Sequence, residues 1–355
     1  ALRQSEAPLI STEWLDALGA PWLTELAELI GAPVITGDTM LALPADHPLA
    51  RADVRAFPLP PETDFVLAVE TIVPWLPDGR EGGRRPRVAF IGRDPIASAT
   101  PIYDFPSDWS LIARADKALA RLVELVKQAA TASQRDRCRA RRDRLEADGR
   151  ERFRTLVERA GAEERSGTLT RDAALGIVGR VLEPEWIVFH EMVEPPLLRR
   201  TRPGTLFGDG GSGIGWAAAA AIGAKVASPD QPVVAICGDG SWFFANPTAC
   251  LWTAQYHRAP VIFIVMNNGG YRTGTVLVAK SYPDGFAVRS RNFEGGWLTP
   301  SPDFAAEARA LGCHGEQVKD PGQLAEALRR AMDAASVEGA STVLDVRLPQ
   351  IGGVA

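Results

Sequence analysis

The sequence predicts an α/β protein made of two doubly wound parallel-sheet domains that are joined by a charged helical linker. Short, unbroken apolar runs such as Arg87–Gly92, Val233–Cys237 and Val261–Met266 alternate with stretches of helical periodicity. Unbroken apolar strands are typical of parallel sheets that are covered on both faces. The alternation is typical of right-handed strand–helix–strand crossovers.

The composition is that of an ordinary soluble globular protein, with 46% hydrophobic and 23% charged residues. The net charge of −5 argues against a dedicated nucleic-acid-binding protein. The chain shows no apolar run of the roughly 18 residues that a membrane span needs and no signal peptide, so we expect no membrane partner. The four cysteines form no CxxC pair, which disfavours disulfide and zinc sites and favours the cytoplasm.

The first domain is expected over residues 1–130. A helix over Trp22–Ile30 precedes a strand over Ala32–Thr36, two more apolar strands follow, and a last helix starts at Asp116. Residues 131–168 are rich in Arg and Glu, and their charges alternate in sign. This pattern is typical of a solvated helix, and we interpret the segment as the linker.

The second domain is expected over residues 169–355. A glycine-rich stretch, Phe207–Gly215, precedes an alanine-rich helix, Trp216–Ala227. After the strand at Val261–Met266 we expect a long loop that contains glycine and arginine, then two helices and the strand Thr342–Val346. This order again favours a doubly wound sheet.

Polar motifs follow two strands of the second domain. The first motif, Gly238-Asp239-Gly240-Ser241, comes after the strand Val233–Cys237, and the second motif, Asn267-Asn268-Gly269-Gly270-Tyr271, comes after Val261–Met266. The carboxyl ends of parallel strands share one edge of a sheet, where ligands bind. A carboxylate, an amide oxygen and a backbone carbonyl suit Mg²⁺, and glycine turns let the backbone approach a phosphate. We therefore predict a metal-bridged diphosphate site.

A second Gly-Asp-Gly triplet, Gly208–Gly210, provides a comparison within the chain. It follows no evident apolar strand, and no asparagine pair comes after it at the corresponding distance. We interpret this copy as an ordinary glycine turn.

The two motifs at this spacing resemble the thiamine diphosphate signature of the acetolactate synthase and benzoylformate decarboxylase superfamily. Residues from Leu26 to about Ala130 resemble the central domain of the family, and the second domain resembles its diphosphate-binding domain. The resemblance implies Mg²⁺ bound by Asp239, Asn268 and the carbonyl of Gly270. It also implies thiamine diphosphate contacts at the remaining motif residues, for which we expect Gly238, Gly240, Ser241 and Tyr271.

The stretch Gly211–Trp216 resembles the family segment whose large apolar residue supports the bent, V-shaped cofactor. This implies that Ile214 is the supporting residue and that Ser212 and Gly213 belong to the cofactor-binding set. The alternative for Ile214 is ordinary core packing at the start of a helix.

Two features depart from the family pattern. After Glu191 the family commonly has hydroxyl or amide residues that contact the diphosphate, and this chain has Met192-Val193-Glu194. In addition, the family's N-terminal domain, which holds the aminopyrimidine and supplies the essential glutamate, has no counterpart here. We therefore expect a pyrimidine-domain subunit as partner, either a separate chain or a cleaved N-terminal piece, in a heterotetramer. The start at Ala1 fits either origin.

The expected function is the diphosphate-binding large subunit of an acetolactate synthase-like enzyme that acts on a small 2-oxo acid or acyl substrate. One alternative is a 2-hydroxyacyl-CoA lyase, whose large anionic substrate would meet the cations of the loop after the second motif. Another is a non-catalytic assembly subunit. The first domain shows no phosphate-binding GxGxxG motif for FAD. We interpret His190 as a structural histidine and Cys237 as a core residue.

Overall fold

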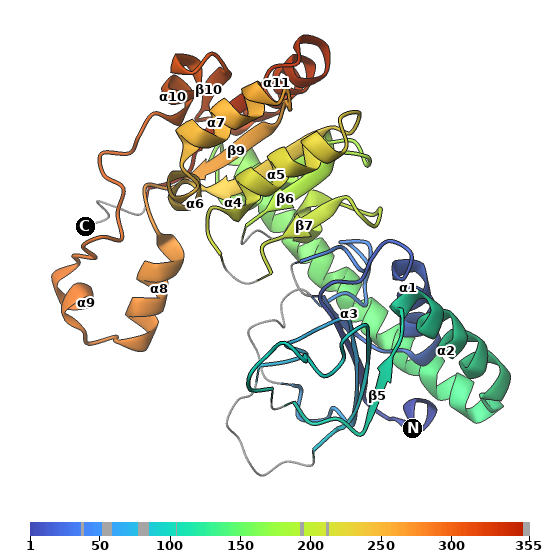
Figure 1. Cartoon of the computed structure of the whole chain (residues 1–355). Coiled ribbons are helices and arrows are strands. Elements are labelled where there is room, and N and C mark those ends of the chain that lie inside the picture. The colour runs from blue at the N-terminus through green and yellow to red at the C-terminus, as the bar shows by residue number, and fades with distance from the viewer. Residues whose placement is uncertain are drawn as a thin grey trace. The chain divides into compact units, whose positions relative to one another are not determined.

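The computed structural model divides into two compact units (Figure 1). The first unit comprises Ala1–Leu156 and Arg199–Gly210, and the second comprises Val157–Leu198 and Gly211–Ala355. The structure describes residues 1–36, 39–51, 59–76, 85–103, 105–191, 195–210 and 213–350.

The first unit contains a parallel five-stranded sheet with the order β2-β1-β3-β4-β5. Three of its strands, β2, β3 and β4, confirm strands that the sequence predicts, whereas β1 and the edge strand β5 were not predicted. β1 lies between β2 and β3, with Ile10 opposite Val34 on one side and Leu67 on the other. The strands are β1 (Pro8–Thr12), β2 (Val34–Thr36), β3 (Phe65–Val69), β4 (Arg87–Gly92) and β5 (Trp109–Ile112).

Two amphipathic helices, α1 (Ala20–Ile30) and α2 (Ala115–Ala129), bury their apolar faces in one core cluster of this unit. Leu23 and Leu119, one from each helix, are entirely buried there. α1 ends at Gly31, whose positive φ of 60° is the left-handed conformation that glycine adopts without strain. A short 3-10 helix (Leu2–Gln4) begins the chain.

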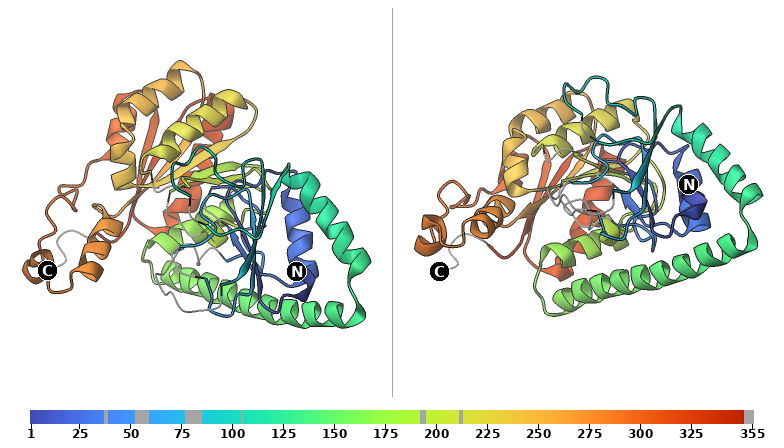
Figure 2. Two further views of the ribbon diagram at one scale, coloured as in Figure 1. Left: turned by 60° about the horizontal axis from the view of Figure 1, so that its bottom comes forward. Right: turned by 90° about the horizontal axis from the view of Figure 1, so that it is seen from below.

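The charged segment expected as the linker forms one 34-residue helix, α3 (Ala132–Arg165), whose residues are divided between the two units. Figure 2 shows it as a single long rod. Its N-terminal part is fixed to the first unit, because Arg141 donates hydrogen bonds to the carbonyls of Gly31 (2.8 Å) and Glu6 (2.9 Å). This part of α3 is therefore packed as well as solvated.

The second unit is built on a sheet in which β10, β11, β9, β8 and β6 follow one another in that order, all in parallel. β8 and β9, the strands that precede the two motifs, are neighbours, as the sequence predicts. The two parallel sheets confirm the predicted fold class. The strands are β6 (Ile187–His190), β8 (Val233–Gly238), β9 (Ile262–Asn267), β10 (His314–Val318) and β11 (Thr342–Arg347), while β7 (Leu206–Gly208) lies in the segment counted with the first unit.

Helices flank this sheet, and several begin at a side-chain cap that accepts a backbone N–H, such as Thr170 for α4 and Asp320 for α11. The bounds are α4 (Arg171–Val181), α5 (Trp216–Ala227), α6 (Asp239–Phe244), α7 (Pro247–Tyr256), α8 (Arg272–Ser281), α9 (Phe286–Ser290), α10 (Phe304–Ala310) and α11 (Pro321–Asp333), with a 3-10 helix at Pro195–Leu198 and a π-helix at Ala334–Glu338.

The prediction of a long loop after the second motif is wrong in detail, because the segment contains two helices, α8 and α9. Neither helix buries any residue, and Figure 1 shows both extending away from the sheet of their unit. In α8, Gly274 lies among β-branched residues that lower helix propensity, which explains the loop prediction.

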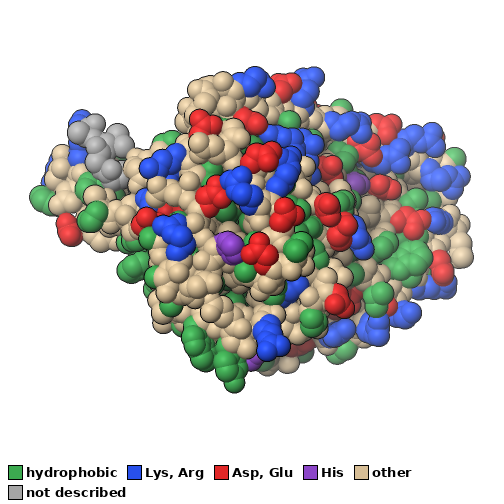
Figure 3. All heavy atoms as spheres, turned by 90° about the horizontal axis from the view of Figure 1, so that it is seen from above, with side chains coloured by type: hydrophobic (Ala, Val, Ile, Leu, Met, Phe, Trp, Pro, Cys, Tyr) green, Lys and Arg blue, Asp and Glu red, His purple; other side chains and the backbone are tan. Residues whose placement is uncertain are grey.

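Within the described residues, none of the helices combines the length and apolarity that crossing a lipid bilayer requires. In the view of Figure 3, basic and acidic side chains are interspersed over the surface.

We expect Gly149→Ala to lower the midpoint of thermal unfolding and Gly161→Ala, in the same helix α3, to leave it unchanged or raise it. A methyl group at Gly149 would lie 2.0 Å from the backbone oxygen of Pro48, so the helix must shift, at a cost of about 1–3 kcal/mol. At Gly161 the nearest atom is the end of the flexible Arg165 side chain, 3.2 Å away, and alanine favours the helix by about 0.5–1 kcal/mol. Thermal unfolding followed by circular dichroism measures both; equal losses would contradict the close contact at Gly149.

Candidate functional site

The sheet of the second unit brings the two motifs together at the ends of β8 and β9. Gly238, the last residue of β8, lies opposite Met266 of β9, and α6 begins directly after it at Asp239. Trp242 of α6 is entirely buried and packs on Phe263 of β9, with ring centroids 5.0 Å apart. The start of α6 is thereby fixed beside the end of β9.

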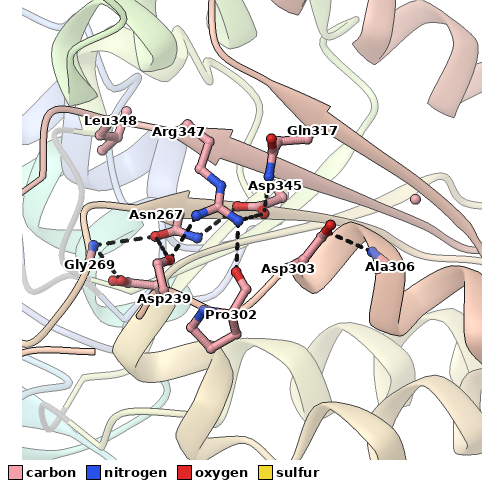
Figure 4. Close-up of polar contacts among 12 residues, drawn as sticks. Asp239, Asn267, Gly269, Pro302, Asp303, Ala306, Gln317, Asp345, Arg347 and Leu348 are labelled. Atoms are coloured by element: carbon pink, nitrogen blue, oxygen red, sulfur yellow. Dashed lines mark hydrogen bonds and ion pairs between the residues drawn. The ribbon is translucent and has the colours of Figure 1, made fainter. Parts of the chain in front are cut away.

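One oxygen of Asp239 joins the motifs directly. Oδ2 accepts hydrogen bonds from the backbone N–H groups of Gly269 and Gly270, both at 2.8 Å, and Figure 4 shows the contact with Gly269. The turn needs glycine at both positions: Gly269 has a φ of 81°, and a side chain at Gly270 would meet the carbonyl oxygen of Gly296 at 2.4 Å. The sequence predicts that the two motifs are neighbours, and in the structure they are in direct contact.

Two other oxygens of the motifs are buried without a hydrogen-bond partner among the described residues, Asp239 Oδ1 and Asn268 Oδ1. Leaving a buried oxygen unpaired costs about 1–3 kcal/mol, so such groups normally have a partner. A cation would be that partner, and a carboxylate with an amide oxygen suits Mg²⁺. The described residues contain no group of three or more His, Cys, Asp or Glu side chains that could hold a metal ion. This donor set fits Mg²⁺ rather than a transition metal.

The third predicted ligand, the carbonyl of Gly270, accepts a hydrogen bond from the N–H of Arg272 at 3.1 Å. A carbonyl oxygen has two lone pairs, so this bond leaves one for a metal ion.

The Asp239 side chain is 1% exposed, and its environment acts on its pKa in two directions. Burial raises the pKa, since it disfavours the charged form, while N–H groups of Gly240, Gly269 and Gly270 lower it. Burial outweighs the hydrogen bonds, so the pKa lies above the ordinary value of 3.8.

The predicted diphosphate contacts begin where α6 leaves β8. A side chain at Gly240 would meet the ring of Tyr271 at 2.6 Å, so the aromatic ring packs directly on the first turn of α6. Ser241 follows in the same turn and is half-buried. The predicted diphosphate-binding residues therefore lie together next to Asp239: Gly238, Gly240 and Ser241 flank it in the chain, and the ring of Tyr271 packs on Gly240.

A second carboxylate, Glu191 at the end of β6, organises the segment that contains Ile214. Its Oε2 accepts the N–H of Gly215 at 3.0 Å and its Oε1 accepts the N–H of Ala217 at 2.7 Å, so it caps the start of α5. A side chain at Gly215 would lie 3.0 Å from the backbone nitrogen of Ala245, at the end of α6. The segment of Ile214 thus packs against the helix that begins at Asp239.

The predicted cofactor-binding residues of this segment differ in how exposed they are and in whether the structure describes them. Gly213 is exposed and Ile214 is half-buried. Ser212, and the residues Met192–Glu194 that depart from the family pattern, lie outside the described residues. The role of Glu191 as a cap was not predicted from the sequence, although an acidic residue at a strand end and a glycine turn before a helix are both visible there.

Other residues that the sequence singled out make none of the hydrogen bonds described above. The copy Gly208–Gly210 does follow a strand, β7, which corrects that expectation, but no asparagine pair accompanies it. His190 and Cys237 are buried, and burial raises the pKa of the Cys237 thiol well above its ordinary value, which favours a core residue. Asp345, which is entirely buried and hydrogen-bonded to Asn267, was not predicted either; the signal in the sequence is a carboxylate inside an apolar strand.

Comparison with known proteins gives a consistent result. Residues 189–346 match the model of the family "Thiamine pyrophosphate enzyme, C-terminal TPP binding domain". The chain is 32% identical over 136 residues to benzoylformate decarboxylase of Pseudomonas aeruginosa, which covers 37% of this chain and 23% of that protein. It is 33% identical over 161 residues to the mitochondrial acetolactate synthase catalytic subunit of Aspergillus candidus, which covers 45% and 22%.

The fold of the whole chain is also found in a solved structure. The thiamine diphosphate-dependent 4-hydroxybenzoylformate decarboxylase of Rhodococcus jostii RHA1 superposes with a TM-score of 0.68 and 19% identity, over 98% of this chain and 62% of that one. At this identity the likeness concerns the fold alone. The matches span less than two thirds of the length of each of these three proteins.

We expect the affinity for divalent cations to fall as the pH is lowered, starting at a higher pH than for an exposed aspartate. The raised pKa of Asp239 means that the folded chain holds this proton more tightly than the unfolded chain. Protons therefore compete with a cation for Asp239 at higher pH than they would for an exposed aspartate. Without metal, the ionised carboxylate lowers the stability of the folded chain once the pH rises through the pKa of Asp239 in the folded state. Isothermal titration with Mn²⁺, which takes the same octahedral oxygen sites as Mg²⁺, measures this; a constant affinity down to about pH 4 would contradict it.

Proposed function

We propose that the chain binds the Mg²⁺ and diphosphate of a thiamine diphosphate-dependent enzyme, because residues 189–346 match the C-terminal TPP binding domain family and the relatives include a benzoylformate decarboxylase and an acetolactate synthase. Its reaction would form or cleave a C–C bond next to a carbonyl. The observation that carries the proposal is the pair of buried, unpartnered oxygens, Asp239 Oδ1 and Asn268 Oδ1, beside two glycine turns.

The residues of the site divide the binding among them. Asp239, Asn268 and the carbonyl of Gly270 would hold Mg²⁺, which neutralises the diphosphate charge. The backbone of Gly238, Gly240 and Gly213, with the hydroxyl groups of Ser241 and Ser212, would contact the diphosphate, and Tyr271 would line the site. When bound, thiamine diphosphate supplies a nucleophilic carbon and an electron sink for carbonyl substrates.

Ile214 has a separate role in the proposal. Its segment is held by Glu191 on one side and packs against α6 on the other. A fixed apolar side chain there would support the bent cofactor by van der Waals contact and keep water from the reacting carbon.

A small 2-oxo acid or acyl compound is the substrate class we propose, in line with the decarboxylase and synthase among the relatives. A second candidate is a 2-hydroxyacyl-CoA lyase with a larger anionic substrate. It is favoured by the exposed cations of the α8–α9 segment, Arg272, Lys280, Arg289 and Arg291. A non-catalytic assembly subunit is disfavoured, since such a protein need not keep a carboxylate and an amide oxygen buried and unpaired.

We also propose that a partner polypeptide completes the site. The residues assigned above account for the metal and diphosphate, and none of them holds the aminopyrimidine or supplies its essential glutamate. A pyrimidine domain, on a separate chain or on another piece of the same precursor, would provide both, in a heterotetramer with two-fold symmetry.

The four cysteines are free thiols, which supports a reducing, cytoplasmic location.

Titration with thiamine diphosphate tests the proposed function. We expect wild-type binding to require Mg²⁺, Asp239→Ala to weaken it at least about 100-fold because the metal is lost, and Ile214→Ala to keep most of the affinity because the metal ligands remain. Isothermal titration with and without Mg²⁺ measures all three. Equal wild-type affinity in both conditions, or full affinity in Asp239→Ala, would refute the assignment.

The partner proposal predicts that the isolated chain lacks activation of the cofactor. We expect it to bind thiamine diphosphate and Mg²⁺ but to show no accelerated exchange of the thiazolium C2 proton, since the activating glutamate lies elsewhere. Nuclear magnetic resonance in D₂O follows the exchange directly, with free cofactor as control. Fast exchange and turnover of a 2-oxo acid by the isolated chain would show that no partner is needed.

A further inference from the structure

Four side chains, from the end of β9, from β11 and from the segment before α10, form a closed ring of hydrogen bonds; Figure 4 labels three of them, Asn267, Asp345 and Arg347. Asn267 Nδ2 donates to Asp345 Oδ1 at 2.9 Å, and Arg347 is paired with Asp345 Oδ2 at 2.7 Å. Arg347 also donates to Ser301 Oγ at 2.8 Å, and Ser301 Oγ donates to Asn267 Oδ1 at 3.0 Å. Each member therefore contacts two others, and the ring closes on itself.

Two members of the ring are fully buried and Ser301 and Arg347 are half-buried, which makes its geometry costly to change. Asn267 and Asp345 are both 0% exposed, and Arg347 lies opposite Asn267 in the register of β9 and β11. A buried charge is tolerated only when it is paired and hydrogen-bonded, and removing one partner leaves the other uncompensated. Arg347 additionally donates to the carbonyl of Pro302 at 2.7 Å, so its planar guanidinium is fixed in orientation.

The ring is connected to the proposed metal site through one backbone N–H. The N–H of Gly269 donates to Asp239 Oδ2 at 2.8 Å and also approaches Asn267 Oδ1 at 3.3 Å. The backbone oxygen of Asn267 is held as well, by the N–H of Leu348 at 2.9 Å and by Gln350 Nε2 at 3.1 Å. Asn267 is thus fixed on both sides, immediately before the proposed ligand Asn268.

A second connection runs through the segment that returns from α9. Tyr271 N–H donates to the carbonyl of Gly296 at 2.8 Å, and the N–H of Leu298 donates to the carbonyl of Gly269 at 2.7 Å. The same segment continues to Ser301, a member of the ring. The turn that contains Gly269 and Gly270 is therefore held by the ring on one side and by this segment on the other.

We propose that Asp345 and Arg347 are positioning residues for the Mg²⁺ site: through Asn267 and Ser301 they fix the Asn268 and Gly270 oxygens for a small octahedral cation. This inference rests on the proposed function. Mg²⁺ demands near-ideal octahedral geometry at about 2.0–2.1 Å, whereas Ca²⁺ accepts irregular geometry at about 2.3–2.6 Å. Loosening the ring therefore affects Mg²⁺ more than Ca²⁺.

The ratio of the two affinities separates positioning from plain structural support. Residues behind metal ligands typically change metal affinity about 10–100-fold when they are substituted. A purely structural role lowers stability and weakens both cations alike. A positioning role changes the preference for Mg²⁺ over Ca²⁺, whatever the change in stability.

The test uses the full chain, titrated with thiamine diphosphate in Mg²⁺ or in Ca²⁺. Arg347→Lys keeps the charge but cannot contact Asp345, Ser301 and Pro302 together, and Ser301→Ala opens the ring while both charges stay paired. The matched control is Arg330→Lys, which alters an arginine–carboxylate pair with Glu316 elsewhere in the same unit. We expect both ring variants to lose about 10-fold in Mg²⁺ and less than about 3-fold in Ca²⁺, and the control to change neither.

Other results would overturn the inference. Equal losses in the two cations, or unchanged affinity in both ring variants, would show that the ring has no positioning role. Circular dichroism checks that each variant folds. Ser301→Ala removes a single hydroxyl group, so the ratio of the Mg²⁺ and Ca²⁺ affinities can be measured on it even if Arg347→Lys does not fold. Absence of Mg²⁺-dependent binding in the wild-type chain would refute the proposed function itself, and this inference with it, whereas wild-type binding with an unchanged ratio in the variants refutes this inference alone.

Discussion

The carboxylate of Asp239 accepts two backbone N–H groups from the turn of the neighbouring strand, and the arrangement of the proposed metal site depends on this contact. Both N–H groups reach the same oxygen because Gly269 adopts a conformation that other residues rarely take. Since Oδ2 receives both bonds, Oδ1 keeps its lone pairs. One contact therefore joins the two motifs and reserves an oxygen for a cation.

The neighbouring strand β6 ends in a carboxylate that is used in a different way. Glu191 also accepts two backbone N–H groups at a glycine turn, but it uses one oxygen for each. Each of its oxygens thereby has a hydrogen-bond partner, and Glu191 acts as a structural cap for α5. Two buried carboxylates at adjacent strand ends thus differ in whether one oxygen is left over. This difference supports Asp239 rather than Glu191 as a ligand of the proposed metal ion.

The sequence predicts those parts of the site that depend on strand order and local pattern. The first and second motifs follow apolar strands, and a parallel sheet places such ends together, so the contact between Asp239 and the glycine turn was predictable. The ring behind it was not, because Asn267 is 78 residues from Asp345 and 34 from Ser301, and no local pattern links them. α3 illustrates the same limit: its charges predict a solvated helix, but its docking depends on Arg141, whose bond to Gly31 spans 110 residues. The helices α8 and α9 were missed because their propensities are weak and neither presents a buried face.

The energetics of the metal-free site explain why the supporting contacts are so numerous. Burial raises the pKa values of Asp239 and Asp345, so at neutral pH both ionised groups oppose folding. The cost at Asp345 is offset in part within the protein, because Arg347 and Asn267 contact its two oxygens, although burial still keeps its pKa above the ordinary value. At Asp239 the hydrogen bonds to Oδ2 offset only part of the cost of burial, and binding of the proposed cation would recover the remainder. A ligand at 100 times its dissociation constant adds about 2.7 kcal/mol of stability to a folded protein. Asp345 is thus paired with a cation of the protein itself, whereas the proposal gives Asp239 its cation from the bound metal, and the side chains around Asp345 hold the turn that contacts Asp239.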